Sequence, residues 1–146
     1  MIKIEEILNI WESDSIIDPT QINYELLTIP KLHSKYLRFY HEHKKASEST
    51  KLKFNKMKNI KTEYYLGNLD KESLDEFGWE QFDLKIGTKG NIDRYINADD
   101  DLNALLIKKS YHDQAVDICK QIIDQINNRS WQLKSYIEYE KFTNGV

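Results

Sequence analysis

The sequence contains little of what interrupts regular structure. Only five glycines and two prolines occur in 146 residues, whereas all-β proteins need many more turn residues. This scarcity favours long helices. A single cysteine, Cys119, excludes an intramolecular disulfide and is typical of a reducing compartment. Its position on an apolar stripe predicts a packed thiol rather than a reactive one.

Long apolar runs are also missing. No segment approaches the roughly 18 apolar residues that span a membrane, and the first residues do not have the pattern of a signal peptide. We therefore expect a soluble, intracellular protein that makes no membrane contact. Hydrophobic residues make up 40% of the chain and charged residues 31%. The chain can thus build one core, or a small core with an oligomerisation element, beneath a well-hydrated surface.

Catalytic and metal-binding patterns are equally scarce. The sequence has no glycine-rich phosphate loop, nucleophile elbow or cysteine–histidine arrangement. A helix would point His41 and His43 in different directions, and Cys119 is too distant in sequence to complete a zinc site. The three aspartates at 99–101 suit a helix cap better than two-metal chemistry, which needs carboxylates from several elements. We predict no enzyme activity, no metal and no cofactor.

Negative charge predominates in the whole chain, but not in one segment. Residues 44–61 hold seven lysines and one acid, Glu48, for a local charge of +6, while the whole chain carries −3. The rest of the chain therefore carries −9. A basic segment on an acidic protein indicates a local site for a polyanion, and the acidic remainder is a candidate surface for protein partners.

Apolar residues recur at helical spacing in the N-terminal part. Residues 1–14 predict a short amphipathic helix. A second helix is expected to start with Asp18 as N-cap and Pro19 at the first helical position. Pro30 lies inside the following apolar pattern, where it either kinks one long helix or separates two. Helix-forming residues continue to Gly67, a predicted C-cap.

The remaining chain divides into a connector and a C-terminal helical part. Residues 68–97 predict an irregular connector with a short strand or helix. Residues 98–146 predict helices, with one apolar face from Leu102 to Ile126 and a possible break at 127–128. Both long apolar faces exceed what a small monomer can cover, so self-association is expected. The predicted oligomerisation residues are Trp131, Leu133, Ile137 and Phe142.

Cations and aromatic rings are mixed along one helical face near the end of the N-terminal part, residues 1–67. Positions 51, 54, 58, 61 and 65 step by three and four residues and therefore share one face. Lysines neutralise phosphates and rings stack on bases, as sequence-tolerant single-strand binding requires. Within the basic segment 44–65, the candidate DNA-binding residues are Lys51, Phe54, Lys58, Lys61, Tyr64 and Tyr65. We expect Lys61 to be exposed; the alternative is a lysine-rich face that is merely solvated.

The same segment resembles the UvsY family of phage recombination mediators. That family carries lysine, alanine, arginine, leucine, aspartate and two tyrosines, where this chain has the seven residues from Asn59 to Tyr65, followed by Gly67. Lys61 stands in place of the family's arginine and keeps the charge. Asn59 replaces the family's lysine, which is a departure. Further similarity lies at 17–25, 34–37 and 126–142, so that it covers most of residues 16–145.

The resemblance implies a function without covalent chemistry. Members of the family form ring-shaped homo-oligomers that bind single-stranded DNA. They loosen the hold of the phage single-strand-binding protein and help to load a RecA-like recombinase, in the cytoplasm of an infected bacterium. One weak binding row for each subunit would gain avidity around a ring. From the residues alone, two other functions stay open: a helical scaffold or adaptor, and an RNA-binding module.

Overall fold

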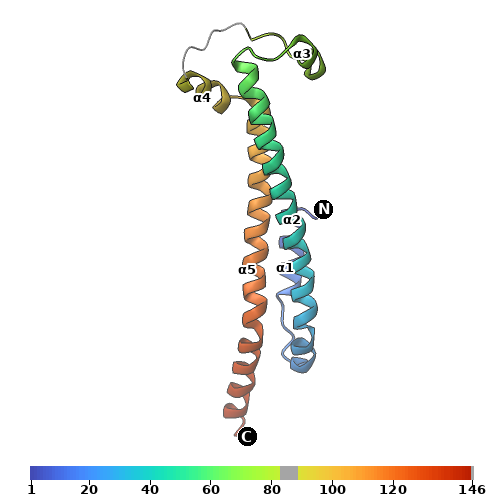
Figure 1. The fold of residues 1–146 in the computed structure, drawn as a ribbon. Helices are drawn as coiled ribbons and strands as arrows, with labels where there is room; N and C mark the ends of the chain where they lie inside the picture. Colours follow the sequence, from blue (N-terminus) through green and yellow to red (C-terminus); the bar gives the residue numbers. More distant parts are fainter. Residues whose placement is uncertain (83–88, 146) are drawn as a thin grey trace. The chain divides into compact units, whose positions relative to one another are not determined.

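The computed structural model describes residues 1–82 and 89–145 (Figure 1). These residues form five helices and no strand, and the all-helical class predicted from the sequence is confirmed. The helices are α1 (Ile4–Asp14), α2 (Ile22–Tyr65), α3 (Lys71–Phe77), α4 (Lys89–Asn97) and α5 (Asp100–Thr143). Within this described part, no helix combines the length and the apolar character that crossing a membrane would require.

Helix α2 continues through Pro30 as one element of 44 residues. Proline removes one backbone donor from a helix interior. Here Pro30 is exposed to solvent, while Ile29 and Leu32 on either side pack against the hydrophobic core. This packing holds the helix across the missing hydrogen bond. The proline therefore lies within one long helix and does not separate two.

The predicted start of α2 at Asp18 is wrong. The Asp18 carboxylate accepts hydrogen bonds from the backbone N–H of Thr20 at 2.9 Å and from the Thr20 hydroxyl group at 2.6 Å. Both acceptor bonds close a turn ahead of the helix, which begins only at Ile22. Pro19 therefore lies in this turn and not at the first helical position.

The predicted C-cap of α2 is confirmed at Gly67. Its φ angle is +76°, a left-handed conformation that glycine adopts without steric cost. The N–H of Gly67 donates to the carbonyl of Tyr64 at 3.0 Å, and the N–H of Asn68 donates to that of Glu63 at 3.0 Å. These two bonds satisfy carbonyl groups that the helix end would otherwise leave without partners.

The acidic run before α5 caps that helix as predicted. Oδ1 of Asp99 accepts a hydrogen bond from the backbone N–H of Leu102 at 3.0 Å, and Asp100 and Asp101 occupy the first turn. Negative charge at this end is favourable because it faces the positive end of the helix dipole. The helix then runs through Asn127 and Asn128 without the suspected break.

The chain divides into two compact units. The first comprises Met1–Lys45 and His112–Val146, and the second comprises Ala46–Tyr111. Each unit contains part of α2 and part of α5. The expected irregular connector contributes two helices, α3 and α4, to the second unit.

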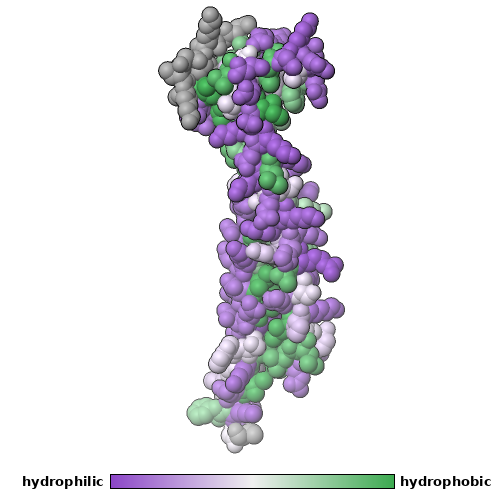
Figure 2. All heavy atoms as spheres, in the orientation of Figure 1, coloured by the Kyte–Doolittle hydropathy of each residue, from purple (hydrophilic) through white to green (hydrophobic). Residues whose placement is uncertain are grey.

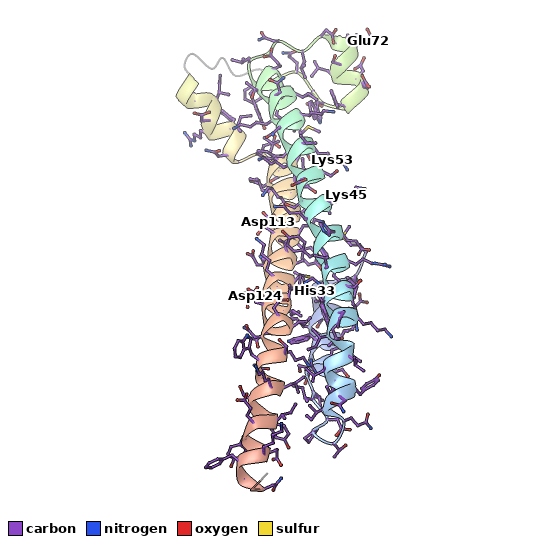
Figure 3. The ribbon with its side chains drawn as sticks, turned by 60° about the horizontal axis from the view of Figure 1, so that its bottom comes forward. His33, Lys45, Lys53, Glu72, Asp113 and Asp124 are labelled. Carbon is purple, nitrogen blue, oxygen red and sulfur yellow. The ribbon has the colours of Figure 1, made fainter. Side chains whose placement is uncertain are left out.

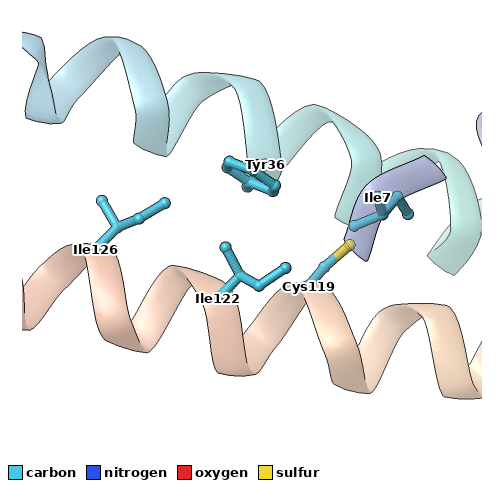
Figure 4. Packing of buried hydrophobic residues seen from close by; sticks show 5 residues of the cluster. All are labelled: Ile7, Tyr36, Cys119, Ile122 and Ile126. Carbon is cyan, nitrogen blue, oxygen red and sulfur yellow. The ribbon is translucent and has the colours of Figure 1, made fainter. Parts of the chain in front are cut away.

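The core of the first unit is a buried, mainly apolar cluster (Figure 4). Ile7 of α1, Tyr36 of α2, and Cys119, Ile122 and Ile126 of α5 form one cluster, with at most 4% of any of these residues exposed. Cys119 is therefore the packed thiol that the sequence predicted. Burial raises the pKa of this thiol to about 11, which keeps it protonated and unreactive near neutral pH.

A buried arginine fastens the turn between α1 and α2 to α5. Arg129 donates to the carbonyl oxygen of Asp14 at 2.9 Å and pairs with the Glu25 carboxylate at 3.0 Å. The Asp14 carboxylate in turn accepts from Lys35 Nζ at 2.6 Å and from the Tyr36 hydroxyl group at 2.8 Å. A single network thus connects all three helices of the first unit beside its apolar core.

Candidate nucleic-acid interface

The orientation of α2 separates the lysines of the basic segment into exposed and buried groups. Within the second unit, Ser47, Thr50 and Lys61 are buried and Phe54 and Met57 are half-buried. These positions step by three and four residues, so they form the inner stripe of the helix. The lysines that lie outside this stripe are exposed, and they are Lys51, Lys53, Lys56 and Lys58.

Lys51, Lys56 and Lys58 form the candidate DNA surface, whereas Lys53 points about 140–160° away from Lys51 and Lys58 around the helix. Figure 3 shows Lys53 projecting from the side of α2. An open groove along the same helix is lined by Asn55, Lys56, Lys58, Asn59 and Thr62. It places two cations beside two side-chain amides, and both kinds of group donate hydrogen bonds to phosphate oxygens. Asn59, which replaces a lysine of the family motif, thus lines the groove between cationic neighbours.

Lys61 lies on the inner stripe, so the expectation that it is exposed is wrong. Only 6% of the residue is accessible. Its Nζ lies 3.0 Å from Oδ2 of Asp99 and 2.8 Å from Oδ2 of Asp101. The ammonium group also lies over the ring of Trp79, 4.2 Å from its centroid, which is close enough for a cation–π interaction. Lys61 is therefore a buried junction between α2, α5 and the chain after α3.

The charges of this junction stabilise one another. Burial by itself would lower the pKa of Lys61, but hydrogen bonds and charge from Asp101 and Asp99 outweigh it and raise the pKa above the usual value for lysine. Burial likewise opposes ionisation of Asp99, yet hydrogen bonds from Tyr65, the Leu102 N–H and Lys61 hold the pKa of Asp99 below its usual range. The pair thus remains charged at neutral pH.

The two predicted tyrosines belong to an aromatic cluster rather than to a free stacking surface. The cluster consists of Tyr64, Tyr65, Trp79, Phe82 and Tyr95. Tyr65 stacks on Tyr95 with ring centroids 5.7 Å apart, and Tyr64 lies 5.1 Å from Trp79. The Tyr65 hydroxyl group donates to Asp99 at 2.6 Å, and that of Tyr64 donates to the Glu80 carbonyl at 2.9 Å. Figure 2 shows apolar side chains gathered beside α3 and α4 among hydrophilic ones.

Helix α3 positions Trp79 over Lys61. The Asp70 carboxylate caps α3 by accepting from the N–H of Ser73 at 2.8 Å. Gly78 ends the helix with φ at +71°, and the N–H of Trp79 donates back to the Leu74 carbonyl at 2.9 Å. The sequence alone did not identify Trp79 as part of this site. Helical periodicity cannot predict a contact between a residue that follows a short helix and a long helix that is distant in sequence.

A histidine pair in the first unit was also missed. Nδ1 of His43 lies 3.0 Å from Nδ1 of His112, and Nε2 of His43 lies 2.8 Å from the carbonyl oxygen of Ile2. His43 therefore pairs with a residue of α5 and not with its sequence neighbour His41. Across residues 1–82 and 89–145, no group of three or more side chains could hold a metal ion.

The predicted oligomerisation residues differ in their exposure. Trp131 is 69% exposed and Phe142 is 86% exposed, whereas Leu133 is only 2% exposed. Leu133 is thus already packed within its own chain. Ile137 is half-buried and lines an open groove together with Pro19, Ile22, Tyr136, Glu140, Lys141 and Asn144.

One family model matches this chain, and two solved structures share its fold. The sequence model described as "Recombination, repair and ssDNA binding protein UvsY" matches residues 10–146. Two crystal structures of the bacteriophage T4 recombination mediator protein UvsY are similar to this chain. Lattice type II has a TM-score of 0.85 at 21% identity and covers 99% of both chains. Lattice type IV has a TM-score of 0.80 at 19% identity and covers 97% of this chain and 99% of that one. No curated protein sequence matches.

Proposed function

Because this chain belongs to the UvsY family, we propose that it binds single-stranded DNA and acts as a mediator of phage recombination and repair. The observation that carries the proposal is the set of exposed lysines at 51, 56 and 58 on α2, of which Lys56 and Lys58 line the groove that contains Asn55 and Asn59. In this segment the cations are accessible and side-chain amides stand next to them. A phosphate backbone can therefore lie along the helix without any base being recognised.

The proposed DNA-binding residues have two different roles. Lys51 and Lys58 are exposed and would neutralise phosphates directly, which releases counterions and makes binding dependent on salt. Lys61, Tyr64 and Tyr65 lie in the buried junction and the aromatic cluster, so they would hold the end of α2 in place beneath the DNA. Phe54 is half-buried and belongs to the inner stripe, so it would support the helix and not stack on a base.

We further propose that the protein works as a ring-shaped homo-oligomer through the C-terminal half of α5. Trp131 and Phe142 support this proposal, because large apolar residues this exposed in a single chain indicate a surface for association. Several subunits would each contribute one lysine row, and together they would bind DNA more tightly than one row. The assembled protein would help to displace the phage single-strand-binding protein and to load a RecA-like recombinase.

The first test is the fluorescence anisotropy of a labelled oligo-dT, titrated with protein across a salt series. We expect binding that weakens steeply with salt and tolerates changes of base. The double variant Lys56→Gln/Lys58→Gln should lower the salt slope by about 1.4, which corresponds to roughly 0.7 for each phosphate contact on a single strand. An oligo-U of equal length tests the RNA-binding alternative.

A matched control separates the lysine row from overall charge. Lys108 and Lys120 are exposed lysines of α5, so Lys108→Gln/Lys120→Gln removes the same charge elsewhere. We expect this variant to keep the wild-type slope. Equal losses in both double variants would show that net charge, and not the α2 surface, drives binding. Absence of binding by folded wild-type protein at low salt would favour a scaffold instead.

A further inference from the structure

The junction at Lys61 contains one cation and two carboxylates. Asp99 is the buried partner, with 3% of its side chain exposed, and Tyr65 and the Leu102 N–H complete its hydrogen bonds. Asp101 lies closer to Lys61, at 2.8 Å, yet 59% of its side chain is exposed. Asp99 alone is enough to neutralise the lysine. The Asp101 carboxylate is therefore a second, solvent-exposed anion that contacts the same ammonium group.

We propose that Asp101 occupies the place of a DNA phosphate on Lys61 and so restrains the affinity of the protein for single-stranded DNA, an inference that rests on the DNA binding proposed above. Carboxylate and phosphate oxygens accept the same charge-assisted hydrogen bond from an ammonium group. Lys58 lies one helical turn before Lys61, and residues three apart are neighbours on a helix surface. A strand bound at Lys58 would therefore have its next phosphates within one helical turn of Lys61.

Exchange of Asp101 for a phosphate would leave the structural contacts in place. Lys61 keeps its pair with Asp99 and its contact with the Trp79 ring, 4.2 Å from the ammonium group. The Asp101 side chain would rotate toward the solvent. Losing its exposed ion pair with Lys61 would cost little folding free energy. Asp101 therefore sets a threshold for DNA binding without being needed for the fold.

The test is a gain of binding in Asp101→Asn, which keeps the shape of the side chain and removes its charge. Asp100→Asn is the matched control, because Asp100 is also exposed in the first turn of α5. Among the described residues, Asp100 forms no ion pair with Lys61. Both variants lose one negative charge at the same helix end, so effects of net charge and of the helix dipole are equal in the two.

We expect Asp101→Asn to bind oligo-dT about three- to fivefold more tightly than Asp100→Asn at low salt, as one exposed ion pair would allow. Its salt slope should be steeper by about 0.7, one additional phosphate contact. Thermal unfolding should be similar for the two variants.

The outcomes distinguish this inference from the proposed function. If wild-type protein binds oligo-dT but the two variants have the same affinity and salt slope, Asp101 is not a competitor and the inference is overturned while DNA binding stands. If folded wild-type protein and both variants fail to bind at low salt, the proposed function and the inference both fail. Tighter binding and a steeper salt slope in Asp101→Asn than in Asp100→Asn support the exchange of one anion for another.

Discussion

The centre of the first unit consists of Ile7, Cys119 and Ile126, all fully buried against one another, whereas the centre of the second unit contains a charged lysine between Asp99 and the ring of Trp79. Both units use the same two long helices. The difference follows the composition of α2, in which apolar positions become sparse after Tyr40 and lysines increase. Where α2 has few aliphatic side chains to bury, rings from other segments and an ion pair fill the space.

This comparison shows that one helix can carry lysines with opposite roles. Lys58 and Lys61 are one turn apart, yet the first is exposed and the second is 6% exposed. An exposed lysine affects binding and hardly affects folding, while a buried and paired lysine affects folding first. Substitutions in the apolar core, in the charged junction and on the exposed surface should therefore differ in how strongly they change stability and binding.

The largest expected effect is in the apolar core of the first unit. Ile126→Ala removes a fully buried side chain and should lower the free energy of unfolding by about 3 kcal/mol, because it leaves a cavity as well as losing apolar burial. Urea denaturation followed by circular dichroism measures this. Leu27→Ala is the control, since Leu27 is 80% exposed. A loss below that of the control would contradict the assignment of the core.

A smaller loss is expected at the charged junction. Lys61→Met keeps much of the side-chain volume but leaves the buried Asp99 carboxylate without its cation, so the free energy of unfolding should fall by about 2 kcal/mol. Hydrogen exchange should locate the weakened amides in α4 and at the start of α5. Adding Asp99→Asn to Lys61→Met should recover part of the loss. A variant as stable as wild type would show that the pair is not structural.

The dependence of stability on pH should distinguish the two units. The pKa of Asp99 is lower in the folded protein, so its contribution is present above the unfolded pKa of about 3.9 and is lost as pH falls through the folded pKa. The pKa of Lys61 is raised, so its contribution is present below about 10.4 and is lost as pH rises through the folded value. Hydrogen exchange at acidic pH should therefore affect the second unit first, whereas at alkaline pH the buried Cys119 thiol makes the first unit sensitive as well. Asp99→Asn should flatten the acidic limb.

The smallest effect on stability is expected at the exposed surface. Lys58→Gln should change the free energy of unfolding by less than about 0.5 kcal/mol, because the side chain is exposed. The same variant should flatten the salt dependence of oligo-dT binding by about 0.7. Thermal melts and anisotropy on one protein preparation give both values. A stable variant with an unchanged salt slope would remove Lys58 from the DNA surface.

Local features were predictable wherever they depend on neighbouring residues. The Gly67 C-cap and the Asp99 cap require only a residue type at a helix end, and both are confirmed. Tertiary packing determined the local structure where contacts with distant segments opposed the conformation that a residue type prefers. Pro30 remains within α2 because Ile29 and Leu32 pack against the core, and Asp18 closes a turn instead of starting the helix.

The candidate site was predictable in its composition and not in its orientation. The sequence placed Lys58 and Lys61 on one helical face. In the structure Lys58 lies at the solvent-exposed edge of that face, while Lys61 lies on the inner stripe. No periodicity of α2 shows where the boundary between the inner stripe and the solvent lies. It is set by the partners Trp79, Asp99 and Asp101, which come from segments after the helix.

The sequence by itself determined that this protein is helical, that its apolar faces are long, and that positive charge is concentrated in one segment, since each of these follows from residue type and spacing along one chain. It also carried the resemblance that the family match confirms. Only the tertiary structure decided which lysines meet solvent and which meet carboxylates. Burial is a property of the segments that pack against a helix, and those segments are distant in sequence.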